Sequence, residues 1–314
     1  MELARTLGYD GVAIGHHLAF GSSVWLPPME TLVRLAPAAE GMSLATCMLV
    51  LPLFHPVHVA QQAAYLDLLT EGRFTLGVAP GWQRDEFEVL GLSHRRRISR
   101  FLESVEIIRR LWTGEPVHFS GQHFSLDGQQ MGLLPVQRPR PAMWFGGSVA
   151  PAVERVGGIA EPSLGDSWVA SSHIVRDRIA RQADRFRNVL RQRGENMPEE
   201  FPVLRNIVVG PDRDTALRDA APALTASYRA MGESGLFTQV VGEQSDQLDL
   251  ERLIAGRVIL GSPEEVAAEL AELRGTIGFN RLIARVQWMG LPQDVVCRSI
   301  ELLAKEVAPR LRSG

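Results

Sequence analysis

The chain has 314 residues, 45% of them hydrophobic, which is enough apolar material for a large buried core. Its 33 basic and 36 acidic residues leave a formal net charge of -3, so no chain-wide field favours nucleic acid or anionic lipid as a partner. The longest apolar run, Leu44 to Phe54, is too short to cross a bilayer, and the two well-separated cysteines favour a reducing compartment, so we expect a cytoplasmic protein with no membrane partner.

Short β-branched or aromatic runs alternate with helical periodicities, which is typical of parallel βα units. The predicted strands lie at residues 10–15, 43–51, 73–79, 142–146, 166–170, 202–210 and 279–287. The predicted helices lie at residues 29–40, 56–70, 97–112, 149–157, 174–193, 262–276 and 293–311. This order and the chain length predict an α/β fold, a (β/α) barrel that takes up residues 1–314 as a single domain.

The start of the chain departs from a complete barrel. A helix begins at Met1, whereas a barrel helix should follow a strand, and seven strands are predicted where eight close a barrel. We therefore expect the first strand to be missing from this chain. Either the true start lies upstream of Met1, or the barrel has a gap that another segment or subunit covers, because an unpaired sheet edge invites association.

Two segments interrupt the βα repeat. Residues 116–127 or thereabouts alternate around a Gly-containing turn, which predicts an inserted hairpin. Residues 212–257 or thereabouts form a long insertion with a mixed helical pattern, which is typical of a lid at the rim of a barrel. The basic run at 94–97 is interpreted as a solvated helix start rather than as an anion site.

The strand at 73–79 opens directly into a small-residue loop that contains Gly77, Ala79 and Gly81. Loss of bulk at that strand end favours a ligand, because parallel α/β proteins bind ligands there, although a tight strand-to-helix turn fits equally well. Gly146-Gly147-Ser148 joins another strand to a helix, so its N–H groups and hydroxyl can converge on a phosphate. Helix caps use the same residues without a ligand.

Two adjacent histidines follow the first predicted strand in Gly15-His16-His17, and we expect one of them to lie in the site. A metal site is disfavoured because the other strand ends, at 46–48, 79–81 and 146–148, are poor in metal ligands. Asp166 is the one carboxylate nearby, and it lies near the start of a strand. We therefore predict no bound metal.

Several spaced motifs in one order resemble the bacterial luciferase-like family of flavin or deazaflavin oxidoreductases. The match is dense from Leu3 to about Trp168 and loose beyond it. The motifs that carry the resemblance are His16-His17, Leu51 to Pro56, Leu66 to Phe74, Gly77 to Trp82, Glu86-Phe87, Leu111 to Gly114, Pro135 to Pro139, Trp144 to Ser148 and Gly165 to Trp168.

The resemblance implies a TIM (β/α)8-type barrel, usually dimeric, with the ring of the cofactor at the C-terminal mouth. By position His16 is similar to the family's rim histidine, which contacts flavin or substrate and moves a proton. Many relatives have an acidic residue before it, and here Gly15 stands there, which puts a carboxylate-assisted role in doubt.

The resemblance also implies a set of cofactor contacts. The segment through Cys47 and Met48 is similar to one that carries a non-proline cis peptide behind the ring, so we predict a cis bond between these two residues. The implied cofactor-binding residues are Thr46, Cys47, Met48, Ala79, Pro80 and Gly81 near the ring, with Gly146, Gly147 and Ser148 near the phosphate.

Three functions follow from this resemblance. The first is a monooxygenase that takes reduced FMN from a separate flavin reductase and uses O2 to oxygenate a small organic substrate. The second is hydride transfer with a deazaflavin coenzyme of the F-420 type, and the third is a non-catalytic flavin-binding paralogue. An apolar substrate is favoured if the apolar side chains near the predicted site line a pocket, but they fit a core equally well: Phe20, Trp25, Met48, Phe54 and Trp82.

Overall fold

The computed structural model describes residues 1–18, 24–236 and 250–312. The chain divides into two compact units. The first contains residues 1–5, 9–146 and 163–166, and the second contains residues 6–8, 147–162 and 167–314.

The first unit is built on a parallel sheet. Its strands are, in spatial order, β1 (Gly11–Ile14), β2 (Ser43–Thr46), β4 (Phe74–Ala79) and β7 (Met143–Gly146), and the short β3 (Leu49–Val50) also pairs with β4. β4 lies in the middle because Phe74, Leu76 and Val78 are buried and fill the core.

Strands β2 and β3 are two halves of one interrupted strand, and both pair with β4. Ala45 aligns with Thr75 and Leu49 with Val78, so four residues of one strand advance against three of the other. The extra residue makes a bulge at Cys47 and Met48, between the two halves. The Cys47–Met48 peptide bond is cis, which confirms the prediction.

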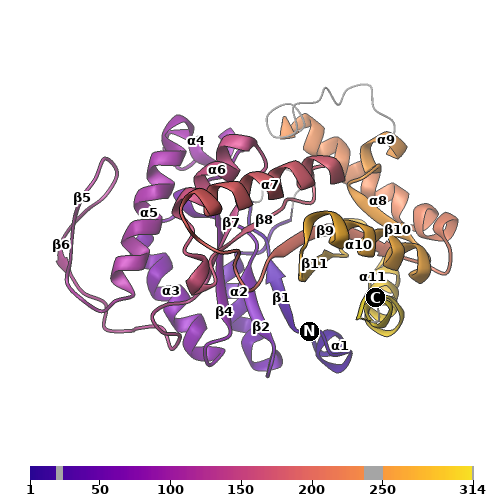
Figure 1. Cartoon of the computed structure of the whole chain (residues 1–314), viewed down its shortest axis with the longest axis horizontal. Helices are drawn as coiled ribbons and strands as arrows, with labels where there is room; N and C mark the ends of the chain where they lie inside the picture. Colours follow the sequence, from indigo (N-terminus) through magenta and orange to yellow (C-terminus); the bar gives the residue numbers. More distant parts are fainter. Residues whose placement is uncertain (19–23, 237–249, 313–314) are drawn as a thin grey trace. The chain divides into compact units, whose positions relative to one another are not determined.

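Helices and a hairpin complete the first unit. The hairpin of β5 (Val117–Ser120) and β6 (Ser125–Gln129) extends away from the sheet (Figure 1), and Glu103 holds its turn by accepting hydrogen bonds from the backbone of residues 122–124. The other elements are α1 (Glu2–Thr6), α2 (Pro28–Leu35), η1 (Ala36–Ala38), η2 (Leu51–Leu53), α3 (Pro56–Leu69), α4 (Arg84–Glu88), η3 (His94–Arg96), α5 (Arg97–Leu111) and η4 (Pro162–Leu164), of which α1 and η4 each include one residue assigned to the second unit.

In the first unit, Asp166 forms a buried network of ion pairs with Arg109 and Arg140. Its fully buried carboxylate accepts hydrogen bonds from Arg109 Nη2 at 2.6 Å, from both terminal nitrogens of Arg140 at 2.8 Å, and from the backbone N–H of Met143 at 2.9 Å. The carboxylate therefore ties α5 to the start of β7. Its oxygens are occupied by cations of the protein itself, as a structural role requires.

The second unit has β8 (Ser167–Val169) and a parallel sheet in the order β10 (Val258–Gly261), β9 (Pro202–Val209) and β11 (Arg281–Arg285). Ala170, just after β8, forms a parallel bridge with Val203 of β9. The helices are α6 (Ala150–Ile159), α7 (Arg176–Gln192), α8 (Arg213–Glu233), α9 (Leu250–Ile254), α10 (Pro263–Ile277), α11 (Gln293–Leu302), the π-helical turn Leu303–Val307 and α12 (Ala308–Arg312).

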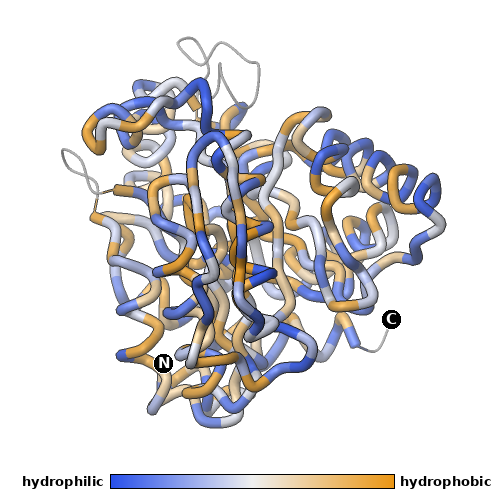
Figure 2. Tube along the Cα trace, turned by 90° about the vertical axis from the view of Figure 1, so that its left-hand side faces the viewer, coloured by the Kyte–Doolittle hydropathy of each residue, from blue (hydrophilic) through white to orange (hydrophobic). Residues whose placement is uncertain are grey.

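Helix α7 illustrates how the sequence pattern fixes burial. Ile179, Ala183, Phe186 and Leu190 recur at helical spacing and are buried, while hydrophilic residues, many of them arginines, lie between them. Figure 2 shows that hydrophobic and hydrophilic residues alternate along the helices of the chain in general. None of the helices in the described ranges is long and apolar enough to cross a membrane.

The sequence pattern did not predict strand β10 or helix α4. β10 lies at the end of the predicted insertion, where four buried residues are too short a run to distinguish a strand from a helix turn. Helix α4 spans five residues between the predicted strand at 73–79 and the predicted helix at 97–112. Of the predicted lid, α8 and α9 are helical, and residues 237–249 lie outside the described part of the chain.

Candidate functional site

The bulge between β2 and β3 is held against the ends of β1 and β4. The backbone N–H of Cys47 donates to Ile14 O at 2.7 Å, and that of His16 donates to Met48 O at 3.2 Å. On the other side, Thr46 Oγ1 donates to Gly77 O at 2.7 Å. A Cβ at Gly77 would lie 1.9 Å from Thr46 O, so this close approach needs glycine.

His16 is almost completely buried and is part of this framework. Its Nδ1 accepts a hydrogen bond from the backbone N–H of Val50 at 3.3 Å, and its ring packs against Phe54 with 5.2 Å between centroids. Burial lowers the pKa of His16 to about 4, although the charge of Glu86 opposes the shift. At neutral pH the ring is therefore uncharged, and because Nδ1 is an acceptor, its proton lies on Nε2.

The depressed pKa of His16 makes a testable contribution to stability. The unfolded chain binds a proton at His16 below pH 6.5 and the native protein does so only below about pH 4, so acidification across this window favours unfolding. We expect His16 to remove about 3 kcal/mol of unfolding free energy across the window, and a His16→Asn variant to lose that part of the pH dependence. Urea unfolding of both proteins over this range measures it, and equal slopes would contradict it.

His17 and Glu86 form a second, more directly chemical pair. Glu86, on α4, is fully buried, and its Oε1 accepts from His17 Nδ1 at 3.0 Å and from the backbone N–H of Leu18 at 2.7 Å. In the neutral ring this contact places the proton on Nδ1 and leaves the Nε2 lone pair available. Glu86 Oε2 is buried and has no hydrogen-bond partner.

Two indole rings flank the His17 imidazole. Trp25 lies 5.0 Å and Trp82 6.0 Å from it between ring centroids, both nearly edge-on. His17 itself stays partly exposed, with 24% of its side chain accessible. The site therefore presents an oriented, reachable nitrogen base with apolar walls.

The loop after β4 is positioned by the basic run at 94–97. Arg97 Nε donates to Gly81 O at 3.0 Å, and His94 Nε2 donates to Trp82 O at 2.9 Å. Gly81 has φ +76°, and a Cβ there would lie 2.6 Å from a methyl group of Val50. Within this run Arg95 and Arg96 are exposed, as predicted for a solvated helix start, whereas the other two residues hold the loop.

The predicted cofactor residues of the first unit come together where the strands end. A Cβ at Gly146 would lie 3.0 Å from Met48 Cγ and 3.1 Å from Ala79 Cβ, so these three residues share one small space. Pro80 and Gly81 follow Ala79 and are partly exposed. Bare backbone beside an apolar sulfur side chain fits a flat aromatic ring, as the flavin prediction requires.

Gly147 and Ser148 belong to the second unit and are described within it. Gly147 O accepts from Trp168 Nε1 at 2.8 Å, and Ser148 O accepts from Gln182 Nε2 at 3.3 Å. The loop leads into α6, whose cap residue Val149 makes no side-chain capping bond. The predicted phosphate contact at these residues stays a prediction.

His16 and the strand-end glycines lie where the sequence predicts them, the catalytic role of His16 stays a prediction, and the sequence assigned no role to Glu86. The acidic positions of α4 look alike in the sequence, and only the fold shows that Glu86 is buried while Glu88 is exposed. A Cβ at Gly15, the position where many relatives have an acid, would lie 3.2 Å from Cys47 O, and the carboxylate that contacts His17 comes from helix α4 instead. Phe20 lies outside the described residues, and within those residues no cluster of metal ligands occurs.

A family model described as luciferase-like monooxygenase matches residues 1–280. A 4-hydroxyprotoasukamycin monooxygenase of Streptomyces nodosus subsp. asukaensis is 31% identical over 330 residues, which covers 100% of this chain and 86% of that protein. An F420-dependent glucose-6-phosphate dehydrogenase of Nakamurella multipartita is 28% identical over 329 residues, with 99% and 90% covered.

Solved structures show the same fold. The monooxygenase RslO1 of Streptomyces bottropensis superposes with a TM-score of 0.84 at 23% identity, covering 98% of this chain and 92% of that one. The oxygenating constituent of 3,6-diketocamphane monooxygenase of Pseudomonas putida, solved with FMN, gives 0.79 at 20% identity, with 99% and 91% covered. An F420-dependent secondary alcohol dehydrogenase with an F420-acetone adduct gives 0.78 at 19% identity, with 99% and 92% covered. The predicted TIM-barrel type of α/β fold is confirmed.

Proposed function

This chain belongs to the luciferase-like monooxygenase family, and we propose that within it the protein is an FMN-dependent monooxygenase that oxygenates a small organic substrate with O2. It is a flavin or deazaflavin oxidoreductase in the wider sense, since its relatives use one or the other cofactor. One observation supports the monooxygenase proposal in particular. The His17 ring lies between the indoles of Trp25 and Trp82 and is oriented by the buried carboxylate of Glu86.

The residues of the first unit fit such a cofactor. Reduced FMN, when bound, supplies the electrons for the activation of O2. Met48, Ala79 and the bare backbone of Gly146 offer the ring a flat apolar wall. His17 Nε2 holds or moves a proton, Glu86 keeps the other ring nitrogen protonated, and the indoles limit the access of water to the imidazole.

Partners and assembly belong to the same proposal. A separate flavin reductase supplies the reduced cofactor, and the protein works in the cytoplasm as a homodimer. Helix α3 supports the dimer because it is apolar around most of its circumference and exposes Tyr65, Leu68 and Leu69. Another exposed apolar residue, Val136, is joined to the same helix by the hydrogen bond from its backbone N–H to Asp67. Size-exclusion chromatography with light scattering measures the mass directly.

Hydride transfer with a deazaflavin of the F-420 type is the second candidate. An F420-dependent dehydrogenase at 28% identity favours it, and the apolar wall at Met48 and Gly146 suits either ring. The non-catalytic paralogue is the third candidate, and a carboxylate-oriented base such as His17 argues against it.

Anaerobic titration followed by tryptophan fluorescence tests the cofactor. We expect reduced FMN to bind at least tenfold more tightly than the reduced deazaflavin. A Gly146→Val variant should lose at least tenfold in FMN affinity, because its side chain fills the space shared with Met48 and Ala79. Gly132→Val is the matched control, since a Cβ there meets nothing within 4 Å, and it should bind as wild type. Tighter binding of the deazaflavin would contradict the proposal.

A further inference from the structure

The second unit contains a cation that none of the described residues neutralises. Arg285 is the last residue of β11 and is partly buried. Its guanidinium lies 5.8 Å from the centre of the Trp288 ring, and it makes no hydrogen bond or ion pair within the described part of the chain. Burial lowers the pKa of Arg285, which is the expected response of a charged group drawn out of water.

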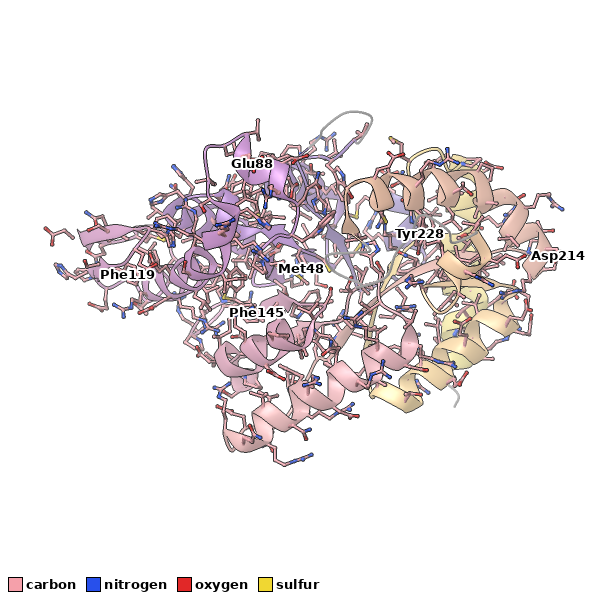
Figure 3. The ribbon with its side chains drawn as sticks, turned by 90° about the horizontal axis from the view of Figure 1, so that it is seen from above. Met48, Glu88, Phe119, Phe145, Asp214 and Tyr228 are labelled. Carbon is pink, nitrogen blue, oxygen red and sulfur yellow. The ribbon has the colours of Figure 1, made fainter. Side chains whose placement is uncertain are left out.

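An unsatisfied amide lies beside this cation. Arg285 aligns with Asn206 in the parallel register of β11 and β9, so both side chains leave the sheet on the same face. Asn206 is 1% exposed, its Nδ2 donates to Tyr228 Oη at 3.5 Å, and its Oδ1 is buried without a partner. Tyr228 comes from α8, on which it is labelled in Figure 3.

A buried amide oxygen without a partner and a partly buried guanidinium without an anion are both unfavourable unless a ligand binds there. A buried polar atom without a partner costs about 1–3 kcal/mol, and a partly buried guanidinium without an anion loses hydration that nothing replaces. The flat fork of a guanidinium matches the two oxygens of a carboxylate or a phosphate. The free Oδ1 of Asn206 is an acceptor, so it can take a hydrogen bond from a hydroxyl or amino group of the ligand next to that oxyanion.

We propose that Arg285, Asn206 and Tyr228 form an oxyanion-binding site that takes a carboxylate or phosphate group of a small ligand. Arg285 makes the charge-assisted contact, and Asn206 and Tyr228 supply neutral polar contacts beside it. Arg285, Asn206 and Tyr228 all belong to the second unit. The site therefore does not depend on which cofactor the protein uses.

Isothermal titration calorimetry with inorganic phosphate and, separately, with benzoate tests the site. We expect wild-type protein to bind at least one probe and Arg285→Gln to bind it at least tenfold more weakly. Asn206→Asp, nearly the same shape with an added negative charge, should also lose at least tenfold. Arg281→Gln is the matched control, because Arg281 lies on the same strand and face but is ion-paired with Glu200, and it should bind within twofold of wild type.

The two probes separate the sources of the oxyanion: binding of benzoate alone assigns a carboxylate, and binding of phosphate alone assigns a phosphate group. Circular dichroism establishes that each variant is folded. If folded wild type binds neither probe, or if Arg285→Gln binds as tightly as wild type, the proposal is wrong and Arg285 serves only to pack on Trp288.

Discussion

A His17→Asn variant should lose about 10²- to 10⁴-fold in kcat, because that substitution removes the oriented base while Asn can still accept or donate one hydrogen bond. Glu86→Gln should lose about tenfold or more, since a neutral amide no longer selects the tautomer with its proton on Nδ1. Steady-state oxygenation of a substrate panel with supplied reduced FMN measures both effects.

The controls for this prediction lie on the same elements. Glu88→Gln, on the same helix α4 but exposed, should leave kcat unchanged. Because Glu86 acts through His17, its variant should change the pH profile of kcat while FMN affinity stays within about twofold. If His16→Asn abolished turnover and His17→Asn did not, the rim histidine expected from the sequence would be the catalytic one.

Removing the buried carboxylate of Asp166 should cost about 3–5 kcal/mol of unfolding free energy, because Asp166→Ala leaves Arg109 and Arg140 without their counter-charge. Urea unfolding at neutral pH measures the loss. Asp127→Ala is the control, since Asp127 pairs with His118 at an exposed position of the hairpin, where a pair contributes at most about 1 kcal/mol. A loss below about 1 kcal/mol for Asp166→Ala would show that the ion pairs of Asp166 with Arg109 and Arg140 do not stabilise the fold.

Strand positions could be predicted from the sequence wherever burial leaves a continuous apolar run. Phe74, Leu76 and Val78 of β4 are apolar, as a strand buried in the middle of a sheet requires. Gly77, near the end of the strand, lies where the backbone of Thr46 approaches closely. β10 escaped detection because four residues carry too little pattern, and its place is set by pairing with β9, a contact of long sequence separation.

Only those features of the site that depend on neighbouring residues in the sequence could be predicted. Gly77 and Gly81 indicate positions where other residues approach the backbone closely, and the paired histidines predict proton transfer at the site. The partner of His17 is Glu86, far away along the chain, and its role depends on the turn of α4 that buries one acid and exposes the next. Arg285 and Asn206 become neighbours only through strand register.

The most direct test of the proposed function is the fate of oxygen. The protein is supplied with a flavin reductase, FMN and isotope-labelled O2, and a panel of small organic substrates is examined by mass spectrometry. The proposal predicts a product that carries one labelled oxygen atom, and its loss in the His17→Asn variant. A product formed instead from the reduced deazaflavin, without labelled oxygen and with hydrogen from the coenzyme, would contradict it.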